Sequence, residues 1–272
     1  MRASLVRRSA LAASVASLVL LATACGGSSD DSDSKSKAGD TSKSASAESA
    51  APEQSDVKAL TAAELEKVSL AQGDVADLKI ENAGAEDILK ASDVTSDKAE
   101  CLPFAHALFA VPQGKPVATT ARTAMAEPKA SDTTTSGDAS EKSLDDAMGA
   151  ALNVSSTMVS LGSYEGGDAA DVLAAVRKAA TACASGFTAT VQGEAQKLSA
   201  ITEQKVAGGE EAVAWNVVEE QEGESFPFGL VVVRQGSTVS TFTTVNMAAA
   251  MDPSVKVEQP TALVAAQVKK VS

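Results

Sequence analysis

Aromatic residues are scarce in this sequence of 272 residues, which holds one Trp, one Tyr and six Phe. Sites for sugars and for single-stranded nucleic acid rely on stacked aromatic rings. Clusters of Lys and Arg are also missing, and the formal net charge is −13, whereas nucleic-acid phosphates are bound by such clusters. The composition therefore excludes nucleic acid as a partner. The acidity itself keeps an exported domain soluble, or attracts cations and basic partners.

Histidine occurs once, as His106, and the Gly-x-Ser-x-Gly elbow of serine hydrolases does not occur. A serine hydrolase needs a histidine base that is oriented by an acid and lies beside a nucleophile. We interpret His106 as a helix residue close to Phe104 and Phe109, not as a base. No catalytic residue is therefore predicted, and the chain is expected not to be an enzyme, unless His106 lies buried beside a Ser and an Asp.

Cysteine occurs three times, at Cys25, Cys101 and Cys183. There is no Cys-x-x-Cys motif and no His/Cys cluster with metal-ligand spacing, so neither a redox thiol, a metal site nor a cofactor is predicted. In an oxidising compartment the pair Cys101 and Cys183 is most simply a disulfide. On the chain-entropy model a bond closing a loop of that length stabilises the fold by roughly 4 to 5 kcal/mol.

No apolar run at the N-terminus is long enough to span a bilayer, which takes about 20 apolar residues. Instead Arg2, Arg7 and Arg8 precede the apolar run 9–23, and this arrangement is typical of an export signal. The small residues 22–24 before Cys25 resemble a bacterial lipobox, although Ala22 stands where that family has a larger aliphatic residue. We therefore predict a lipoprotein signal peptide over residues 1–24. The alternative is ordinary cleavage that leaves a free thiol.

The resemblance to bacterial lipoproteins implies a diacylglyceryl thioether on Cys25, with fatty acyl chains such as palmitate. Two chains are needed for stable attachment, since one chain binds only marginally. The expected location is thus the outer face of the cell membrane. Residues 25–56 are almost wholly Ser, Asp, Lys, Ala and Glu, which predicts a disordered linker with a reach of about 30 Å. The Ala-rich, acidic composition is typical of actinobacteria.

Residues 57–272 are predicted to form one extracytoplasmic α+β domain. Its second half is the clearer: residues 156–164 alternate like a half-buried strand, Asp168 is expected to cap a helix that runs to about Ser185, and Gln235-Gly236 joins two strands of a hairpin. We expect a twisted, mostly antiparallel sheet with helices packed on one face. The predicted helices are 61–69, 103–110, 168–185 and 260–271; the strands are 76–81, 117–125, 156–164, 187–192, 198–204, 211–219, 228–234 and 237–246; residues 127–142 are read as an exposed, disordered loop.

Two acidic clusters, Glu210-Glu211 and residues 219–224, are the other candidates for a site. Carboxylates bind calcium when turn residues space them, as in the EF-hand, and this spacing is absent. We interpret the second cluster as a solvated connection between strands and predict no metal. Trp215 is interpreted as a core anchor, with the wall of a cleft as the alternative.

A helix end, Ala-Cys-Ala-Ser-Gly at 182–186, is followed by the run Ala-Val-Ala-Trp-Asn-Val-Val at 212–218, and then by the hairpin and the C-terminal helix. With these residues, the order of elements resembles the extracellular sensor domain of PknH-type mycobacterial serine/threonine kinases. The resemblance implies an α+β fold with a cleft proposed to bind a ligand, and typically two disulfides. This chain has cysteines for one disulfide and no kinase portion.

The sequence thus predicts a membrane-anchored, extracytoplasmic module that binds or senses a ligand without catalysis. A small molecule, a lipid or a cell-wall fragment is the expected ligand class, and its binding residues are not identified. The alternative is an envelope lipoprotein that binds another protein through a surface patch. A pocket of several hundred Å³ would favour the first hypothesis, and an exposed apolar patch without a cavity would favour the second.

Overall fold

The computed structural model describes residues 58–126, 152–221, 223–252 and 255–272, which lie within one unit, Ala51–Ser272. The predicted signal peptide, Cys25, the linker and the loop 127–142 lie outside the described residues. No helix in the described ranges is both long and apolar enough to cross a membrane. The domain boundaries given above therefore stay a prediction.

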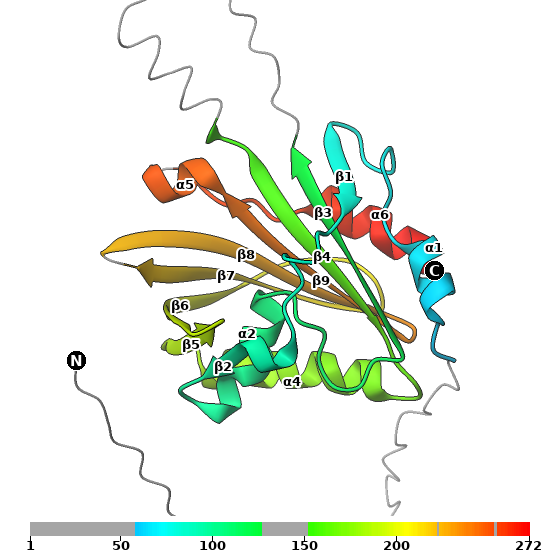
Figure 1. Cartoon of the computed structure of the whole chain (residues 1–272), viewed down its shortest axis with the longest axis horizontal. Coiled ribbons are helices and arrows are strands. Elements are labelled where there is room, and N and C mark those ends of the chain that lie inside the picture. Colours follow the sequence, from blue (N-terminus) through cyan, green and yellow to red (C-terminus); the bar gives the residue numbers. More distant parts are fainter. Residues whose placement is uncertain (1–57, 127–151, 222, 253–254) are drawn as a thin grey trace, which may run out of the picture. The chain divides into compact units, whose positions relative to one another are not determined.

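A nine-stranded sheet in the order β1-β3-β4-β9-β8-β7-β6-β5-β2 forms the framework, and every neighbouring pair is antiparallel. Figure 1 shows the long central strands fanning across the domain. The α+β class, the antiparallel sheet and its single disulfide are as predicted. The strands are β1 Leu78–Asn82, β2 Val94–Ser96, β3 Ala118–Ala126, β4 Ser155–Ser163, β5 Phe187–Val191, β6 Glu194–Gln204, β7 Glu211–Gln221, β8 Glu224–Gln235 and β9 Thr238–Asn246.

Helices pack on both faces of the sheet, whereas the sequence analysis expected them on one. Successive side chains of a strand point to opposite faces, and the central strands bury both: Trp215 joins one core cluster and its neighbour Ala214 the other. Strands buried on both sides read as continuous apolar runs, and the Val-rich β8 is an example. The helices are α1 Ala62–Val68, α2 Leu102–Leu108, α4 Asp168–Ala182, α5 Met247–Met251 and α6 Thr261–Val271, with 3-10 turns at Ala91–Asp93 and Ala99–Cys101.

One side of the sheet, called the α4 face, is covered by α2 and α4. Figure 1 shows these two helices together over the lower strands. Cys101, just before α2, is bonded to Cys183 at the C-terminal cap of α4, with their Cα atoms 5.8 Å apart. Phe104 of α2 packs edge-on against Trp215, with ring centroids 5.3 Å apart. The interpretation of Trp215 as a core residue agrees with its 3 % exposure.

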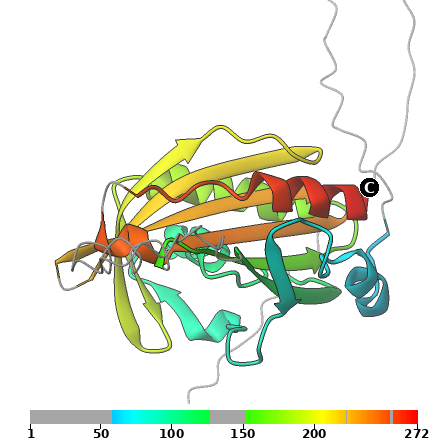
Figure 2. The ribbon, with the colours of Figure 1, turned by 90° about the horizontal axis from the view of Figure 1, so that it is seen from above.

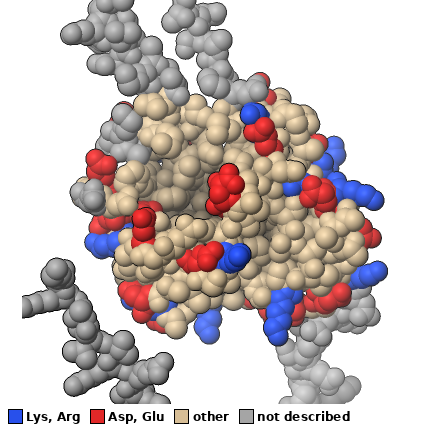
Figure 3. Space-filling model, viewed as in Figure 1, with Lys and Arg blue, Asp and Glu red and all other residues tan. Residues whose placement is uncertain are grey.

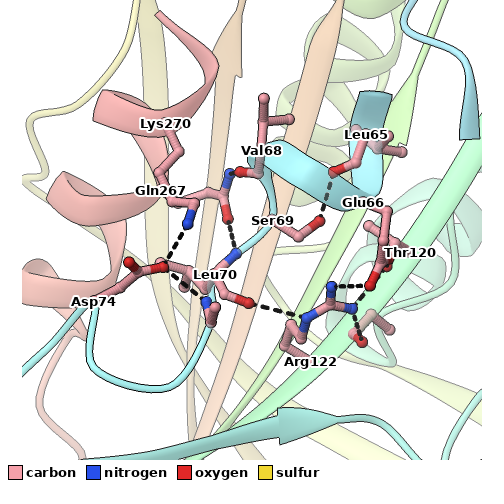
Figure 4. Close-up of polar contacts among 12 residues, drawn as sticks. Leu65, Glu66, Val68, Ser69, Leu70, Asp74, Thr120, Arg122, Gln267 and Lys270 are labelled. Carbon is pink, nitrogen blue, oxygen red and sulfur yellow. Dashed lines mark hydrogen bonds and ion pairs between the residues drawn. The ribbon is translucent and has the colours of Figure 1, made fainter. Parts of the chain in front are cut away.

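The opposite side, called the α6 face, is covered by α1 and α6, and Figure 2 shows α6 lying along the sheet. Thr61 caps α1 in the capping box that the sequence predicts. Arg122 of β3 is 6 % exposed; its Nε donates a hydrogen bond to the Leu70 carbonyl, and its guanidinium pairs with Glu66 (Figure 4). These contacts hold α1 and the segment after it on the sheet.

Three local expectations need correction. The cap of α4 is Gly167, and Asp168 is the first residue of the helix and makes no capping bond with its side chain; its charge still favours the positive end of the helix dipole. The hairpin between β8 and β9 turns one residue later than expected, at Gly236-Ser237, where Gly236 takes a positive φ of 57°. Finally, β7 runs two residues beyond the predicted end of the strand at Glu219, so Glu220 belongs to β7 and not to a connection between strands.

Candidate functional site

The α4 face is only partly covered, and its open part is the candidate site. α2 and α4 pack over the half of the sheet that contains Trp215 and Leu230. Beyond them, Figure 3 shows the surface hollowed over β8 and β9, between α5 and α2, with acidic side chains at its rim. The alternation of the strands assigns the following described residues to this part of the face, and we call them the α4-face hollow: Met158, Glu219, Phe226, Phe228, Thr243 and Val245.

The floor of the hollow is mostly apolar and half-buried. Met158, Phe226, Phe228 and Val245 are each partly exposed. Thr243 is held between the floor and α2, since its hydroxyl donates to the Leu108 carbonyl at 2.8 Å. An apolar floor with a few fixed polar groups is the usual composition of a ligand pocket.

A cavity of about 320 Å³ opens beside Met158 at the end of the hollow nearer to β3. Its walls come from the segment 87–91, the segment after α2 and strands β3 and β4. Val111 and Ser160 are buried at its edge, and Lys90 and Asp87 are the charged residues of its lining. The cavity has the volume of a small-ligand site, which runs from roughly 300 to 1,000 Å³.

Glu219 is the unusual residue of the hollow. It is only 6 % exposed, because it continues the inward row of Val213, Trp215 and Val217 along β7. Burial raises the pKa of its carboxyl above the ordinary value, since the charged form loses hydration. Among the described residues no donor or cation is bonded to its carboxylate, and neither oxygen is sealed from solvent.

Glu219 ends the predicted strand 211–219, but it is not identified there as a site residue because it is grouped with the acidic run that follows. The signal was available, since residues 213, 215, 217 and 219 alternate with period two, and the next inward position after Val217 is Glu219. A charged residue in an inward position is rare without a partner. Its neighbour Glu220 points the other way and pairs with Lys197, and this contact lowers its pKa.

The first acidic cluster is engaged in ion pairs. Glu210 and Glu211 both bind the guanidinium of Arg234, which reaches them from β8. Across the described ranges no group of three His, Cys, Asp or Glu is arranged to hold a metal ion. The prediction that no metal binds here therefore stays a prediction, and these pairs account for the first acidic cluster.

His106 lies in the wall of a separate cavity of about 520 Å³ between α2 and the N-terminal end of α4. Its Nε2 is 3.4 Å from the Val94 carbonyl oxygen, and its side chain is half-buried. Two aspartates, Asp168 and Asp171, line the same cavity, but none of its described lining residues is a serine. The arrangement that would have made His106 a hydrolase base is therefore not found in this lining.

Tyr164 closes the floor of the His106 cavity. Its hydroxyl donates to the Gln113 carbonyl at 2.9 Å, and burial raises its pKa to about 12. A neutral, bonded tyrosine at this position braces the segment 113–116 and offers no ionised group to a ligand.

A third cavity, of about 770 Å³, lies near the β6–β8 end of the sheet, against the segment 255–259. Its lining alternates charges of both signs, Lys205, Lys256 and Glu258, with Val218, Pro227 and Val257. Large volume alone does not define a site, and the charged residues of this lining, Lys205, Lys256 and Glu258, are all exposed. The α4-face hollow is preferred because it contains a buried carboxyl group, that of Glu219, to which no described residue is bonded.

Comparisons with known proteins come from solved structures. No protein-family model matches the sequence, and no curated protein matches it either. The chain resembles the extracellular domain of PknH. That domain, from Mycobacterium tuberculosis, is matched with 12% identity and a TM-score of 0.45 over 79% of this chain and 98% of that one. A putative uncharacterized protein of Mycobacterium smegmatis, the Rv0999 ortholog, is matched with 13% identity and a TM-score of 0.34 over 81% of this chain and 98% of that one.

The first of these is the domain to which the sequence analysis found a resemblance. At this level of similarity no residue of PknH is equated with a residue of this chain. The roles discussed below are argued from this chain's own contacts.

Proposed function

We propose that this chain is a lipid-anchored, extracytoplasmic module that binds a small amphiphilic ligand in the α4-face hollow, without catalysis. The anchor rests on the sequence of residues 1–25, as argued above. The binding role rests on one observation: a half-buried apolar floor meets a buried carboxyl group that has no partner in the described residues. A buried polar group without a partner costs stability, and a ligand that bonds to it recovers that cost.

The geometry suits a small molecule or one lipid chain better than a second protein. The hollow is concave, and it continues toward a cavity of about 320 Å³. The large apolar side chains that are most exposed, Ile88, Val117, Met125 and Met247, are spread over three segments: the connection after β1, β3 with the residue before it, and α5. The envelope protein-interaction role is kept as the alternative outcome of the test below.

Native mass spectrometry of the full-length chain, purified from an actinobacterial host, tests the binding role. We expect a bound molecule of defined mass that is lost when the hollow is filled by Val245→Trp. Ala195→Trp is the matched control, because it adds the same ring at an exposed position of β6 on the other face.

Retention of the bound mass by Val245→Trp, with loss in the control, would place the ligand elsewhere. A folded chain that carries no bound molecule would favour the protein-interaction role instead.

A further inference from the structure

The end of the hollow formed by β6, β7 and β8 carries negative charge only. Alternation along these strands assigns Glu194, Glu219 and Glu224 to the α4 face, together with the amides of Gln196 and Gln221. Lys197 points to the α6 face with its partner Glu220, and Arg234 lies at the far end of β8. In the described part of these strands, no cation therefore shares this end of the face with the three carboxylates.

Two acceptors at this end lack donors. The Glu219 carboxylate has no bonded partner among the described residues, as shown above. The Gln196 side-chain oxygen Oε1 is buried and likewise without a hydrogen bond. Leu198 stands directly opposite Glu219, and Gln196 is the next residue on the same side of β6. Such diagonal neighbours stand roughly 7 to 8 Å apart. The Gln196 oxygen is sealed from solvent, so the Glu219 carboxylate, which is not, is the acceptor that a ligand reaches.

Two aromatic rings flank the carboxylate on the next strand. Phe226 stands directly opposite Glu219, and Phe228 is the following residue on that side. The face of a phenyl ring attracts a cation that lies within about 6 Å of its centre. The same rings offer apolar contact to the rest of a ligand.

These features are complementary to a cation that carries an apolar group. We propose that the α4-face hollow selects organic cations, an ammonium or guanidinium group joined to an apolar body, with Glu219 as the anionic anchor and Phe226 and Phe228 beside it. This specificity rests on the proposed function, that the hollow is a binding site. Anionic ligands are disfavoured because three carboxylates face them at this end.

Isothermal titration of the full-length chain in non-ionic detergent with three probes of one shape tests the specificity. The probes are 3-phenylpropylammonium, 3-phenylpropanol and 3-phenylpropanoate, which share the apolar body and differ in charge. A hydrogen bond to a charged group corresponds to about a ten- to hundredfold difference in affinity. We expect the ammonium probe to bind more tightly than the alcohol by that factor, and the carboxylate probe to bind most weakly.

The variant Glu219→Gln keeps the side-chain shape and removes the charge, so the preference for the ammonium probe should disappear. Glu220→Gln is the matched control: it is the adjacent residue, removes the same charge and points to the other face. It should leave the preference unchanged.

The outcomes separate the two proposals. Equal affinity of the wild-type chain for all three probes would overturn the cation specificity and leave the hollow as a binding site. An equal loss of preference in Glu219→Gln and Glu220→Gln would assign the effect to overall charge, and would also overturn the specificity. No binding of any probe would overturn the proposed function itself.

Discussion

At the scale of single residues, the pattern of one strand explains both the core and the candidate site. Val213, Trp215 and Val217 fill the space under α2 and α4, and the next inward residue, Glu219, projects where those helices no longer cover the sheet. A carboxyl group at such a position is costly for folding. Stability alone therefore does not account for Glu219 at this position, whereas the proposed binding role does.

The variant Glu219→Gln is expected to raise the stability of the free chain at pH 7. The pKa of this carboxyl is raised above its ordinary value of 4.5 in the folded state. The folded chain therefore binds the proton more tightly than the unfolded chain, and stability falls as pH rises from about 4.5 through the raised pKa. The gain from Glu219→Gln should shrink toward zero near pH 4. Thermal unfolding of both chains across this range measures it, and a gain that grows on acidification would contradict the assignment.

At the scale of elements, α6 buries a polar residue, Gln267, on its apolar side, where the amide is hydrogen-bonded to backbone groups. Gln267 lies at helical spacing from Leu263 and Val264, and all three side chains are buried. The Gln267 amide nitrogen donates to the Val68 carbonyl at 2.8 Å, and its oxygen accepts from the Leu70 N–H at 3.1 Å (Figure 4). It thereby bonds the backbone that leaves α1 and joins the two ends of the domain.

Replacing Gln267 with Leu is expected to destabilise the fold by about 2 to 4 kcal/mol, since two backbone groups lose their partners and each costs roughly 1 to 3 kcal/mol when buried. Urea unfolding measures the change. Ala265→Leu, on the exposed side of the same helix, should shift stability by no more than about 0.5 kcal/mol. Equal effects of the two substitutions would show that helix propensity and not the paired amide is responsible.

At the scale of the whole molecule, the proposal depends on where the chain resides. The two termini of the described domain, at α1 and α6, lie side by side, as Figure 1 shows and their packing confirms. The hollow is on the other face, formed by strands from the second half of the sequence. An anchor upstream of α1 would therefore attach to the domain away from its candidate site.

The variant Cys25→Ser tests the anchor. Lipidation needs the thiol, and two acyl chains are what hold a protein stably on a membrane. We expect the wild-type chain in the membrane fraction and Cys25→Ser in the soluble or secreted fraction, each measured by immunoblot. Ser28→Ala, a substitution three residues further along that keeps both Cys25 and the disulfide, is the control and should leave the membrane association unchanged. Membrane association of Cys25→Ser at the wild-type level would refute lipid attachment through this residue.

Local patterns were sufficient for most elements of this domain and for its disulfide. The cap at Thr61, the apolar stripes of α4 and α6 and the alternation of β4 all depend on neighbours in sequence, and the structure has each of them. The two cysteines could be paired because an oxidising compartment leaves one simple choice. Boundaries such as Gly167 were missed by one residue, since glycine also caps a helix and propensity alone does not rank the two positions.

Only the tertiary structure decided what lies on each face. The sequence by itself determined which strands alternate apolar and polar residues and which are apolar throughout. It did not determine which helix covers which face of the sheet, because that depends on packing between residues far apart in the chain. Trp215 and Glu219 follow the same alternation, yet α2 covers the first and leaves the second beside an open hollow. Glu219 is a candidate site residue because neither α2 nor α4 covers it, and which residues these helices cover is decided only when they pack on the sheet.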